Sequence, residues 1–551
     1  MKKQIGLLAL FILAVTFTFA QEKSDKVEIS WGDEFKTSRR ATLSHLIGHD
    51  ETGIYALKTK RNILGLVKKT VYLEHFDNEM NRTTAVELEL EENGKEKDYE
   101  FIVQMNNDLH VFSSYKNQKL KKNFLFVQPL DKNTLQPSGP SEKVAEISYR
   151  SYGKYNSGNY AYRMSRDSSK VLVYYNLPYK RGENEKFGFH VYNNNMELLW
   201  EKDVELPYKD GLYRVDGFNI DNSGNVHLLG MVFDNNRALR RSGRSGHNAD
   251  VVTFRSKRKG KPNYHYEINS YRDLGESETK YPIEIKGKFL SDMQITINED
   301  SDIICGGFFS KVGTFSIKGA YFLKIDSETK EIVSESFKNF GIDFITSTMR
   351  KGKKKRTKKK AAKGKNVELY EYDLDEIVLK DDGGAILIGE QYYIRVVTTT
   401  TSNANGGTST TTTYHYYYND IIAINMSSDG QIEWAKKIAK RQHTTNDGGF
   451  YSSYSLSVKD DKMYFIFNDN VKNMDYKGDG KIANFTKSKK ALAVLVTLDN
   501  NGNQEKEALF TAKEAGILCR PKVCEQISND EVILFGQRKK KQRFSKMKFK
   551  N

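Results

Sequence analysis

One recurring pattern constrains the fold of this 551-residue chain more than any other feature: an alternating strand, a tight polar turn and a second, apolar strand. It is clearest around the turns at 221–225, 298–302 and 381–384. Asp, Asn and Gly fill these turns because they tolerate left-handed backbone and close tight hairpins. Weaker copies have turns at Asp50, Asn107, Asp167, Asp460 and Asn529, which gives eight copies.

A second hairpin follows most copies, so each unit should hold four strands. Examples are 320–333, 420–434 and 492–502. Four-stranded units repeated in this way are typical of β-propeller blades. The sequence therefore predicts an all-β chain that forms a β-propeller of eight four-stranded blades. Seven blades is the alternative, because the polar stretch 234–262 hides the third strand of the fourth unit.

The two ends of the chain complement each other. The last unit ends one strand short, while residues 28–31 resemble the fourth strands at 197–200 and 431–434. All three tryptophans, Trp31, Trp200 and Trp434, fall at this position. We therefore expect residues 29–35 to pair with 544–549 and to close the ring, which removes an exposed sheet edge. A coincidence of three rare residues is the alternative.

Residues 1–20 have the features of a secretion signal: Lys2 and Lys3, an apolar run over 5–19, and Ala20 at the end. A membrane anchor is the alternative, but the run is shorter than the ~20 residues that span a bilayer. Residues 21–551 should then form a single domain with no transmembrane segment, in the periplasm or cell envelope of a bacterium.

Three cysteines cannot build a disulfide framework. Cys519 and Cys524 could pair in an oxidising compartment or remain free, and the sequence leaves this open. Cys305 lies in an apolar run and should be a small buried side chain.

Two segments, 414–422 (YHYYYNDII) and 440–449 (KRQHTTNDGG), carry a resemblance to a group of uncharacterised secreted bacterial proteins. The resemblance covers roughly residues 370–470. It implies a secreted, β-propeller-like protein and brings no known activity and no catalytic residues.

The repeat assigns every loop to one of two faces. Turns between first and second strands lie on one face and are mostly acidic. Loops between second and third strands lie on the other, with the connections between units, and are mostly basic. The net charge of the chain is +16. Because positive charges that sum over one face concentrate anions, we expect this basic face to bind an anionic partner.

The most basic segment is 350–366, which we expect to be a disordered loop between two units on the basic face. A merely solvated loop is the alternative. A second lysine group follows the last turn. The predicted anion-binding residues are Lys353, Lys354, Lys355, Arg356, Lys358, Lys359, Lys360, Lys539, Lys540 and Lys541.

Residues 392–418 form the second unusual segment. Two threonine runs, 398–401 and 410–413, flank the sequence 402–407, and aromatic residues continue both runs inward. The pattern predicts that the second and third strands of the sixth unit extend into a long hairpin that projects from the basic face. A disordered or glycosylated low-complexity loop is the alternative.

Motifs for catalysis are missing from the sequence. There is no His-Glu-x-x-His zinc motif, Walker phosphate loop or nucleophile elbow, so we predict no catalytic residue, no metal and no cofactor. Arg441, His443 and Asp447 share one loop on the basic face and form a possible site. Ordinary surface decoration is the alternative for them.

These observations favour a secreted, non-catalytic binding or scaffold protein. Its expected partner is an acidic glycan, a lipid phosphate or an acidic protein. Secretion argues against nucleic acid as the natural partner, although the charge would bind it in a test tube. The alternative is a hydrolase or lyase that acts on an anionic polymer. The sequence does not indicate the ligand or the oligomeric state.

Overall fold

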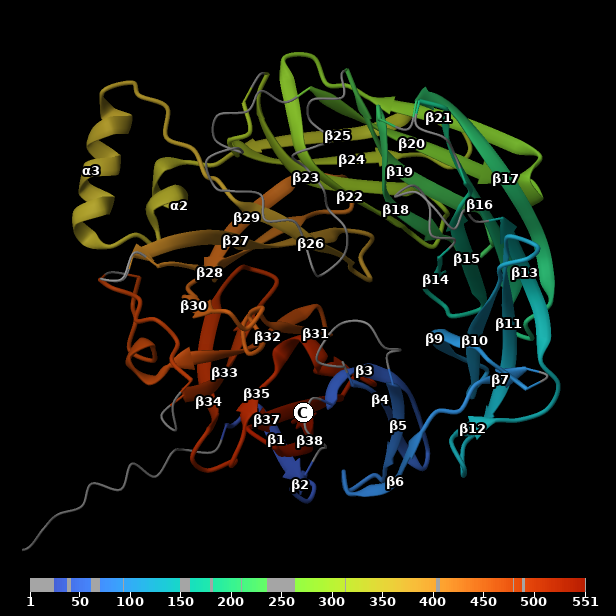
Figure 1. The fold of residues 1–551 in the computed structure, drawn as a ribbon. Helices are drawn as coiled ribbons and strands as arrows, with labels where there is room; N and C mark the ends of the chain where they lie inside the picture. The colour runs from blue at the N-terminus through green and yellow to red at the C-terminus, as the bar shows by residue number, and fades with distance from the viewer. Residues whose placement is uncertain are drawn as a thin grey trace, which may run out of the picture.

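The computed structural model describes residues 24–36, 41–60, 70–92, 94–148, 159–178, 182–209, 211–234, 263–312, 314–402, 407–478, 480–487 and 491–550. Within them, the chain forms eight sheets, each with four antiparallel strands at its centre, and two short α-helices. The sheets follow one another around a ring, an arrangement consistent with a β-propeller (Figure 1).

The first seven sheets take their strands in chain order, and the first strands of the first six sheets contact one another in succession. The first four sheets are β3 (Ala41–Asp50), β4 (Gly53–Lys60), β5 (Thr70–Phe76) and β6 (Arg82–Glu87); β9 (Asp98–Met105), β10 (Asp108–Asn117), β11 (Lys122–Asp131) and β13 (Glu142–Ser148); β14 (Tyr160–Met164), β15 (Lys170–Asn176), β16 (Asn184–Asn193) and β17 (Leu198–Lys209); and β18 (Tyr213–Ile220), β19 (Val226–Phe233), β20 (Tyr264–Arg272) and β21 (Ser277–Ile283).

The next three sheets are β22 (Lys288–Ile297), β23 (Ile303–Lys311), β24 (Gly319–Ile325) and β25 (Ile332–Asn339); β26 (Tyr372–Leu379), β27 (Ala385–Ser402), β28 (Thr408–Met426) and β29 (Ile432–Ile438); and β31 (Ser455–Lys459), β32 (Lys462–Asn470), β33 (Ala491–Leu498) and β34 (Gln504–Thr511). The eighth is β35 (Leu518–Cys519), β37 (Glu531–Arg538), β38 (Lys541–Phe549) and β1 (Val27–Trp31). Short strands are added at β2 (Phe35–Lys36), β12 (Gln136–Pro137), β30 (Gln442–Thr445) and β36 (Glu525–Gln526), and β7 (Glu91–Glu92) pairs with β8 (Lys95–Glu96).

The N-terminal strand completes the last sheet. β1 pairs with β38 from Val27 opposite Phe549 to Trp31 opposite Ser545, and β2 pairs with the same strand. This confirms the predicted pairing of the chain ends. The three tryptophans all lie in fourth strands, in β1, β17 and β29.

The hydrophobic core is divided among the junctions between sheets. A cluster of buried side chains joins each sheet to the next, and a further cluster joins the eighth sheet to the first through Phe35, Leu43, Phe535 and Phe544. Burying one such side chain fully contributes about 1.5–3 kcal/mol. The clusters therefore run through all eight junctions and close the ring. The fourth unit is also complete, because β20 supplies its third strand.

The turns between the first and second strands contain residues that accept a left-handed backbone. Asn106 and Asn107 have φ of 47° and 69°, and Asp460 and Asp461 have φ of 49° and 57°. Two consecutive positive φ angles are what a type I′ two-residue hairpin turn requires, and Asn and Asp accept them most readily after Gly.

The basic segment differs from the prediction. It forms a helix, α3 (Lys351–Ala362), preceded by α2 (Ile342–Thr346), so the expected disorder is wrong. Lys, Arg and Ala are strong helix formers, which outweighs the repulsion among the lysines. The helix is terminated by Gly364, two residues after its last residue, Ala362. The φ of Gly364 is +67°, and the N–H groups of Gly364 and Lys365 donate to the carbonyls of Ala361 and Lys360.

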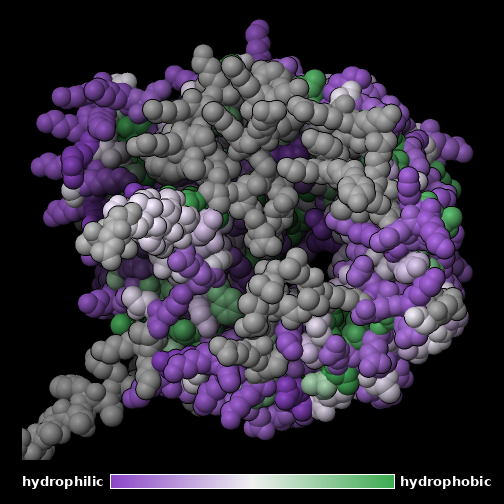
Figure 2. Space-filling model, in the orientation of Figure 1, coloured by the Kyte–Doolittle hydropathy of each residue, from purple (hydrophilic) through white to green (hydrophobic). Residues whose placement is uncertain are grey.

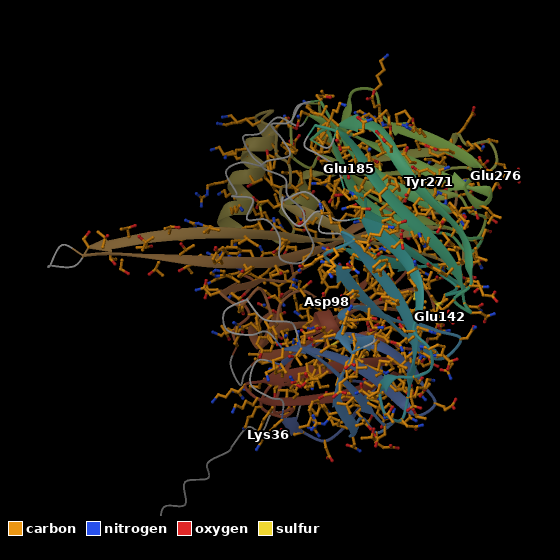
Figure 3. The ribbon with its side chains drawn as sticks, turned by 45° about the vertical axis from the view of Figure 1, so that its right-hand side comes forward. Lys36, Asp98, Glu142, Glu185, Tyr271 and Glu276 are labelled. Atoms are coloured by element: carbon orange, nitrogen blue, oxygen red, sulfur yellow. The ribbon has the colours of Figure 1, made fainter. Side chains whose placement is uncertain are left out.

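The predicted hairpin is confirmed. β27 and β28 pair from the sheet out to Ser402 opposite Thr408, and the pair projects well beyond the body of the molecule (Figure 3). We call residues 392–418 the arm. Its tip, 403–406, lies outside the described residues, as do the predicted secretion signal and most of the polar stretch 234–262.

Candidate anion-binding surface and inner wall

Helix α3 presents a concentrated positive charge. Eight of its twelve residues are Lys or Arg, and none of its side chains is buried. Only Lys354, Thr357 and Ala361, which share one face, are partly covered. Among the described residues, Lys358 is the one basic residue of α3 with a carboxylate partner, Asp343 at 2.5 Å. Hydrophilic side chains project from this edge of the molecule (Figure 2).

A lysine of the sixth sheet contacts helix α2, which precedes α3. Lys437 of β29 donates to the carbonyl oxygen of Ile345 in α2, at 3.4 Å. Burial lowers the pKa of Lys437 to about 8; the charge of Asp420 opposes this shift and that of Lys353 adds to it. Helix α2 contacts both α3 and β29, so it links α3 to the sixth sheet.

The second lysine group lies elsewhere. Lys539, Lys540 and Lys541 lie at the turn from β37 to β38 in the eighth sheet, whereas α3 connects the fifth sheet to the sixth. The two groups occupy separate positions around the ring (Figure 1). Lys541 is also paired with Glu34 at 2.6 Å. The structure therefore does not bring the two groups of predicted anion-binding residues together.

Of the predicted loop site, the structure keeps Arg441 and His443 near each other and separates Asp447 from them. His443 lies opposite Tyr417 and stacks on it, with ring centroids 4.3 Å apart. Burial lowers the pKa of His443, with smaller effects from His415 and Arg441. Asp447 instead pairs with Lys487 and accepts a hydrogen bond from Thr444, at 2.6 Å.

Strand alternation explains this separation. Neighbouring residues of a strand point to opposite faces, so Thr444 and its partner Asp447 lie across the sheet from His443. The His443 Nε2 atom lies 3.0 Å from Nδ1 of His415. Arg441, His443 and Asp447 therefore do not form one site.

A second group of charged residues was missed by sequence reasoning. It lies on the inside of the ring, where the sixth, seventh and eighth sheets meet, and we call it the inner-wall cluster. Its members are Asp375 of β26, Glu390 of β27, Lys440, Ser453, Tyr454 and Lys522 of the 3-10 helix Pro521–Val523.

Glu390 makes two contacts in this cluster, and its ion pair with Lys440 is fully enclosed. Lys440 and Glu390 form an ion pair in which both side chains are at most 4% exposed. Ser453 donates to the other carboxylate oxygen of Glu390 at 2.8 Å. Because charges are stable away from water only when paired, these residues hold each other in one arrangement.

Asp375 and Lys522 are both exposed to solvent at the edge of this cluster. Tyr454 donates to Asp375 at 2.7 Å, and Lys522 donates to the hydroxyl of Tyr418 at 2.8 Å. Loss of solvation raises the pKa of Asp375 well above its usual range, and the charge of Glu390 raises it further. Loss of solvation also lowers the pKa of Lys522.

A bulge places Asp375 in this position. The pairing of β26 with β27 shifts between Leu374 and Glu376, which leaves Asp375 without a cross-strand partner. The first strands β9 and β18 have equivalent shifts, at Glu100 and Asp216. Bulges redirect side chains and often lie beside functional sites. The sequence signal that could have indicated this cluster is an Asp or Glu at the same place in the first strand of three units: Glu100, Asp216 and Asp375.

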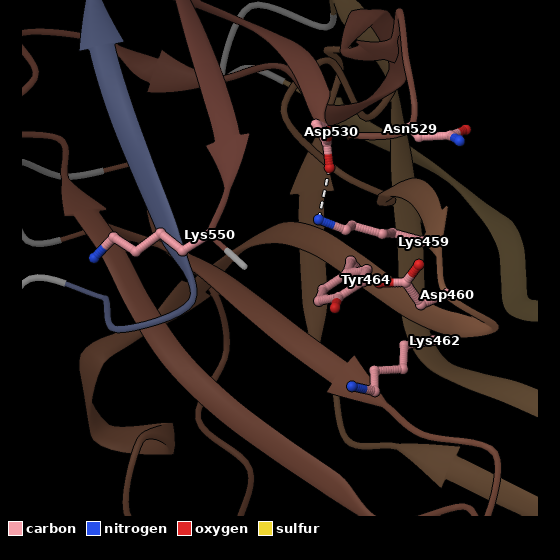
Figure 4. A pocket seen from close by; sticks show the side chains of 7 residues that line it. All are labelled: Lys459, Asp460, Lys462, Tyr464, Asn529, Asp530 and Lys550. Carbon is pink, nitrogen blue, oxygen red and sulfur yellow. Dashed lines mark ion pairs between the residues drawn. The ribbon is translucent and has the colours of Figure 1, made fainter.

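A hollow of about 480 Å³ lies between turns of the seventh and eighth sheets (Figure 4). Its lining mixes both charges, and Lys459 pairs with Asp530 at 2.6 Å across it. It shares no residue with α3 or with the inner-wall cluster. Its lining residues are Lys459, Asp460, Lys462, Tyr464, Asn529, Asp530 and Lys550.

The cysteines are free in this structure. The sulfurs of Cys519 and Cys524 lie 3.7 Å apart, and burial raises the pKa of Cys305 to about 12. In the part of the chain that the structure describes, no group of three or more His, Cys, Asp or Glu residues could hold a metal ion. No described helix is long and apolar enough to cross a bilayer.

Comparisons with known proteins give no family. No family model and no curated protein matches the chain. The acylaminoacyl peptidase of Pyrococcus horikoshii is 10% identical over 93% of this chain, which spans 58% of the peptidase, with a TM-score of 0.33.

Two further solved structures are equally distant. An ulvan lyase from a new family of polysaccharide lyases is 7% identical over 87% of this chain and 96% of its own, with a TM-score of 0.34. Drosophila plexin A in complex with semaphorin 1b is 8% identical over 94% of this chain and 87% of its own, with a TM-score of 0.30. Similarities this low assign no function.

Proposed function

We propose that this protein is a secreted, non-catalytic eight-bladed β-propeller of the bacterial periplasm or cell envelope that binds an anionic partner through helix α3. An acidic glycan, a lipid phosphate and an acidic protein all have the required charge. The observation that carries the proposal is the exposure of α3: eight of its twelve residues are basic, and among the described residues only Lys358 has a carboxylate partner.

Electrostatics favours binding over a purely solvating role. Successive basic residues of a helix lie within about one Debye length of each other, so their potentials add at physiological salt. An anionic chain along the helix would replace the repulsion among lysines with attraction. Binding of this kind is strong at low salt and weakens steeply as salt rises.

Retention on a heparin-like matrix tests the proposal. The variant Lys353→Gln, Lys354→Gln, Lys355→Gln, Arg356→Gln should elute at clearly lower salt than the wild-type protein. Replacing Lys539, Lys540 and Lys541 with Gln should have a smaller effect, because Lys541 already has Glu34 as a partner. Asp381→Asn with Asp382→Asn, at a turn on the other face, is the matched control and should not weaken retention. Equal elution of the wild type and both lysine variants would contradict the proposal.

The inner-wall cluster favours one alternative, a hydrolase or lyase that acts on an anionic polymer. Such chemistry needs an acid and a base whose environments move their pKa values toward neutrality. The pKa of Asp375 is raised and that of Lys522 is lowered, and both remain accessible to water. In this second function Asp375 would donate a proton and Lys522 would accept one.

Incubation with acidic polysaccharides separates the two functions. An enzyme would release unsaturated or reducing ends, and Asp375→Asn or Lys522→Met would abolish this release while leaving binding through α3 intact. Polysaccharides that are bound but remain uncut would support the non-catalytic function.

A further inference from the structure

The outer part of the arm has no charge. Residues 396–414 contain no Asp, Glu, Lys or Arg, in a chain in which 29% of residues are charged. They also contain no proline. Exposed sheet edges of soluble proteins are usually protected by charges or proline, because an unprotected edge pairs with other strands. The arm is therefore an unprotected edge on a protein with charged residues elsewhere.

Both edges of the arm are open. Among the described residues, β27 pairs with a third strand only as far as Gln391, and β28 only as far as His415. Beyond these points, Thr398–Ser402 and Thr408–Thr412 are exposed to solvent. An isolated two-stranded ribbon is marginally stable in water, so a further strand beside it would stabilise it.

The side chains of the arm suit an identical partner. Thr398 lies against Thr412 with their hydroxyl oxygens 3.3 Å apart, and Thr400 lies against Thr410 at 3.2 Å. Each strand carries four threonines in a row, so two copies of one edge in antiparallel orientation would place threonine opposite threonine. Threonine pairs across strands are favourable, and no charge opposes the approach.

We propose that two copies of this chain associate through their arms, with the β27 edge around Val397–Thr401 of one copy paired to the same edge of the other. The pairing is antiparallel and generates a four-stranded sheet about a two-fold axis. Charge selects the place of contact: the net charge of +16 makes the bodies repel each other, while the projecting, uncharged arms can meet away from them. This inference does not depend on the partner of α3.

Sedimentation velocity over a range of protein concentrations tests the proposal. The wild type should move as a dimer at the higher concentrations. A shortened arm, in which residues 398–412 are replaced with Asn-Gly to join Val397 to Thr413, should be monomeric and fold normally. Thr399→Lys should weaken the dimer severalfold because two lysines would face each other across the axis. The control, Ser428→Lys, adds the same charge at an exposed turn of the same sheet and should leave the dimer unchanged.

Salt dependence separates this inference from the proposed function. The arm-mediated dimer should persist or strengthen as salt rises, because screening reduces the repulsion between bodies, whereas binding through α3 should weaken. A wild type that stays monomeric at every concentration, or a shortened arm that still dimerises, would overturn the proposal.

Discussion

Helix α3 and the inner-wall cluster differ in how their charged residues are exposed and paired. On α3, basic residues stand in water with a single carboxylate partner among the described residues. In the inner-wall cluster, Lys440 and Glu390 are paired away from water. Asp375 and Lys522 each form a hydrogen bond with a tyrosine hydroxyl. The first arrangement acts through summed charge. The second acts through individual side chains in fixed positions.

This difference separates binding from stability. Water solvates the charges of α3 in the free protein, so the fold gains little from them and they remain available to a partner. The enclosed pair has lost its water, so each partner stabilises the fold only while the other is present. Substitutions should therefore affect stability in the inner wall and affinity on the helix.

The largest effect should follow removal of one partner of the enclosed pair. Lys440→Met leaves the carboxylate of Glu390 buried and unpaired, and we expect the free energy of unfolding to fall by about 3–5 kcal/mol. Lys358→Met breaks the exposed pair with Asp343 and should lower the free energy of unfolding far less, because solvent screens that pair. Urea denaturation of both variants checks the comparison. Similar losses would show that enclosure does not matter here.

A smaller, pH-dependent effect should follow Asp375→Asn. The pKa of Asp375 is raised in the folded protein, so the folded state holds its proton more tightly than the unfolded state. The contribution of Asp375 to stability should therefore be lost as pH rises from about 4, its unfolded pKa, through the folded pKa. The variant should show less of this decline and should be more stable than the wild type at pH 8. Thermal melts in which the wild type and Asp375→Asn lose stability equally as pH rises would refute this prediction.

The smallest effect on stability should come from α3 itself. Replacing Lys353, Lys354, Lys355 and Arg356 with Gln should change the free energy of unfolding by less than about 0.5 kcal/mol, since these are surface substitutions. Relief of repulsion between lysines one turn apart should favour the helix slightly. A loss of several kcal/mol in denaturant would mean that α3 is part of the fold rather than a binding surface.

The sequence predicted those parts of the molecule that depend on local chemistry. The first turns, the β27–β28 hairpin and the pairing of the chain ends follow from Asp, Asn and Gly in the turns, from threonine runs and from the place of Trp31, and all are confirmed. The disorder expected at 350–366 is wrong, because the helix propensity of Lys, Arg and Ala outweighs the repulsion among the lysines. A carboxylate at one place in the repeat could have indicated Asp375. The rest of the inner-wall cluster could not be predicted, because its residues come from three sheets and meet only when the ring assembles.

The central claim is that α3 binds an anionic partner through summed charge, and the salt dependence of heparin affinity tests it most directly. The logarithm of the association constant should fall linearly with the logarithm of salt concentration for the wild type. Neutralising Lys353, Lys354, Lys355 and Arg356 should lower the magnitude of this slope by roughly 1 for each basic residue that contacts the polyanion. An unchanged slope would contradict the claim and place the binding charge elsewhere on the molecule.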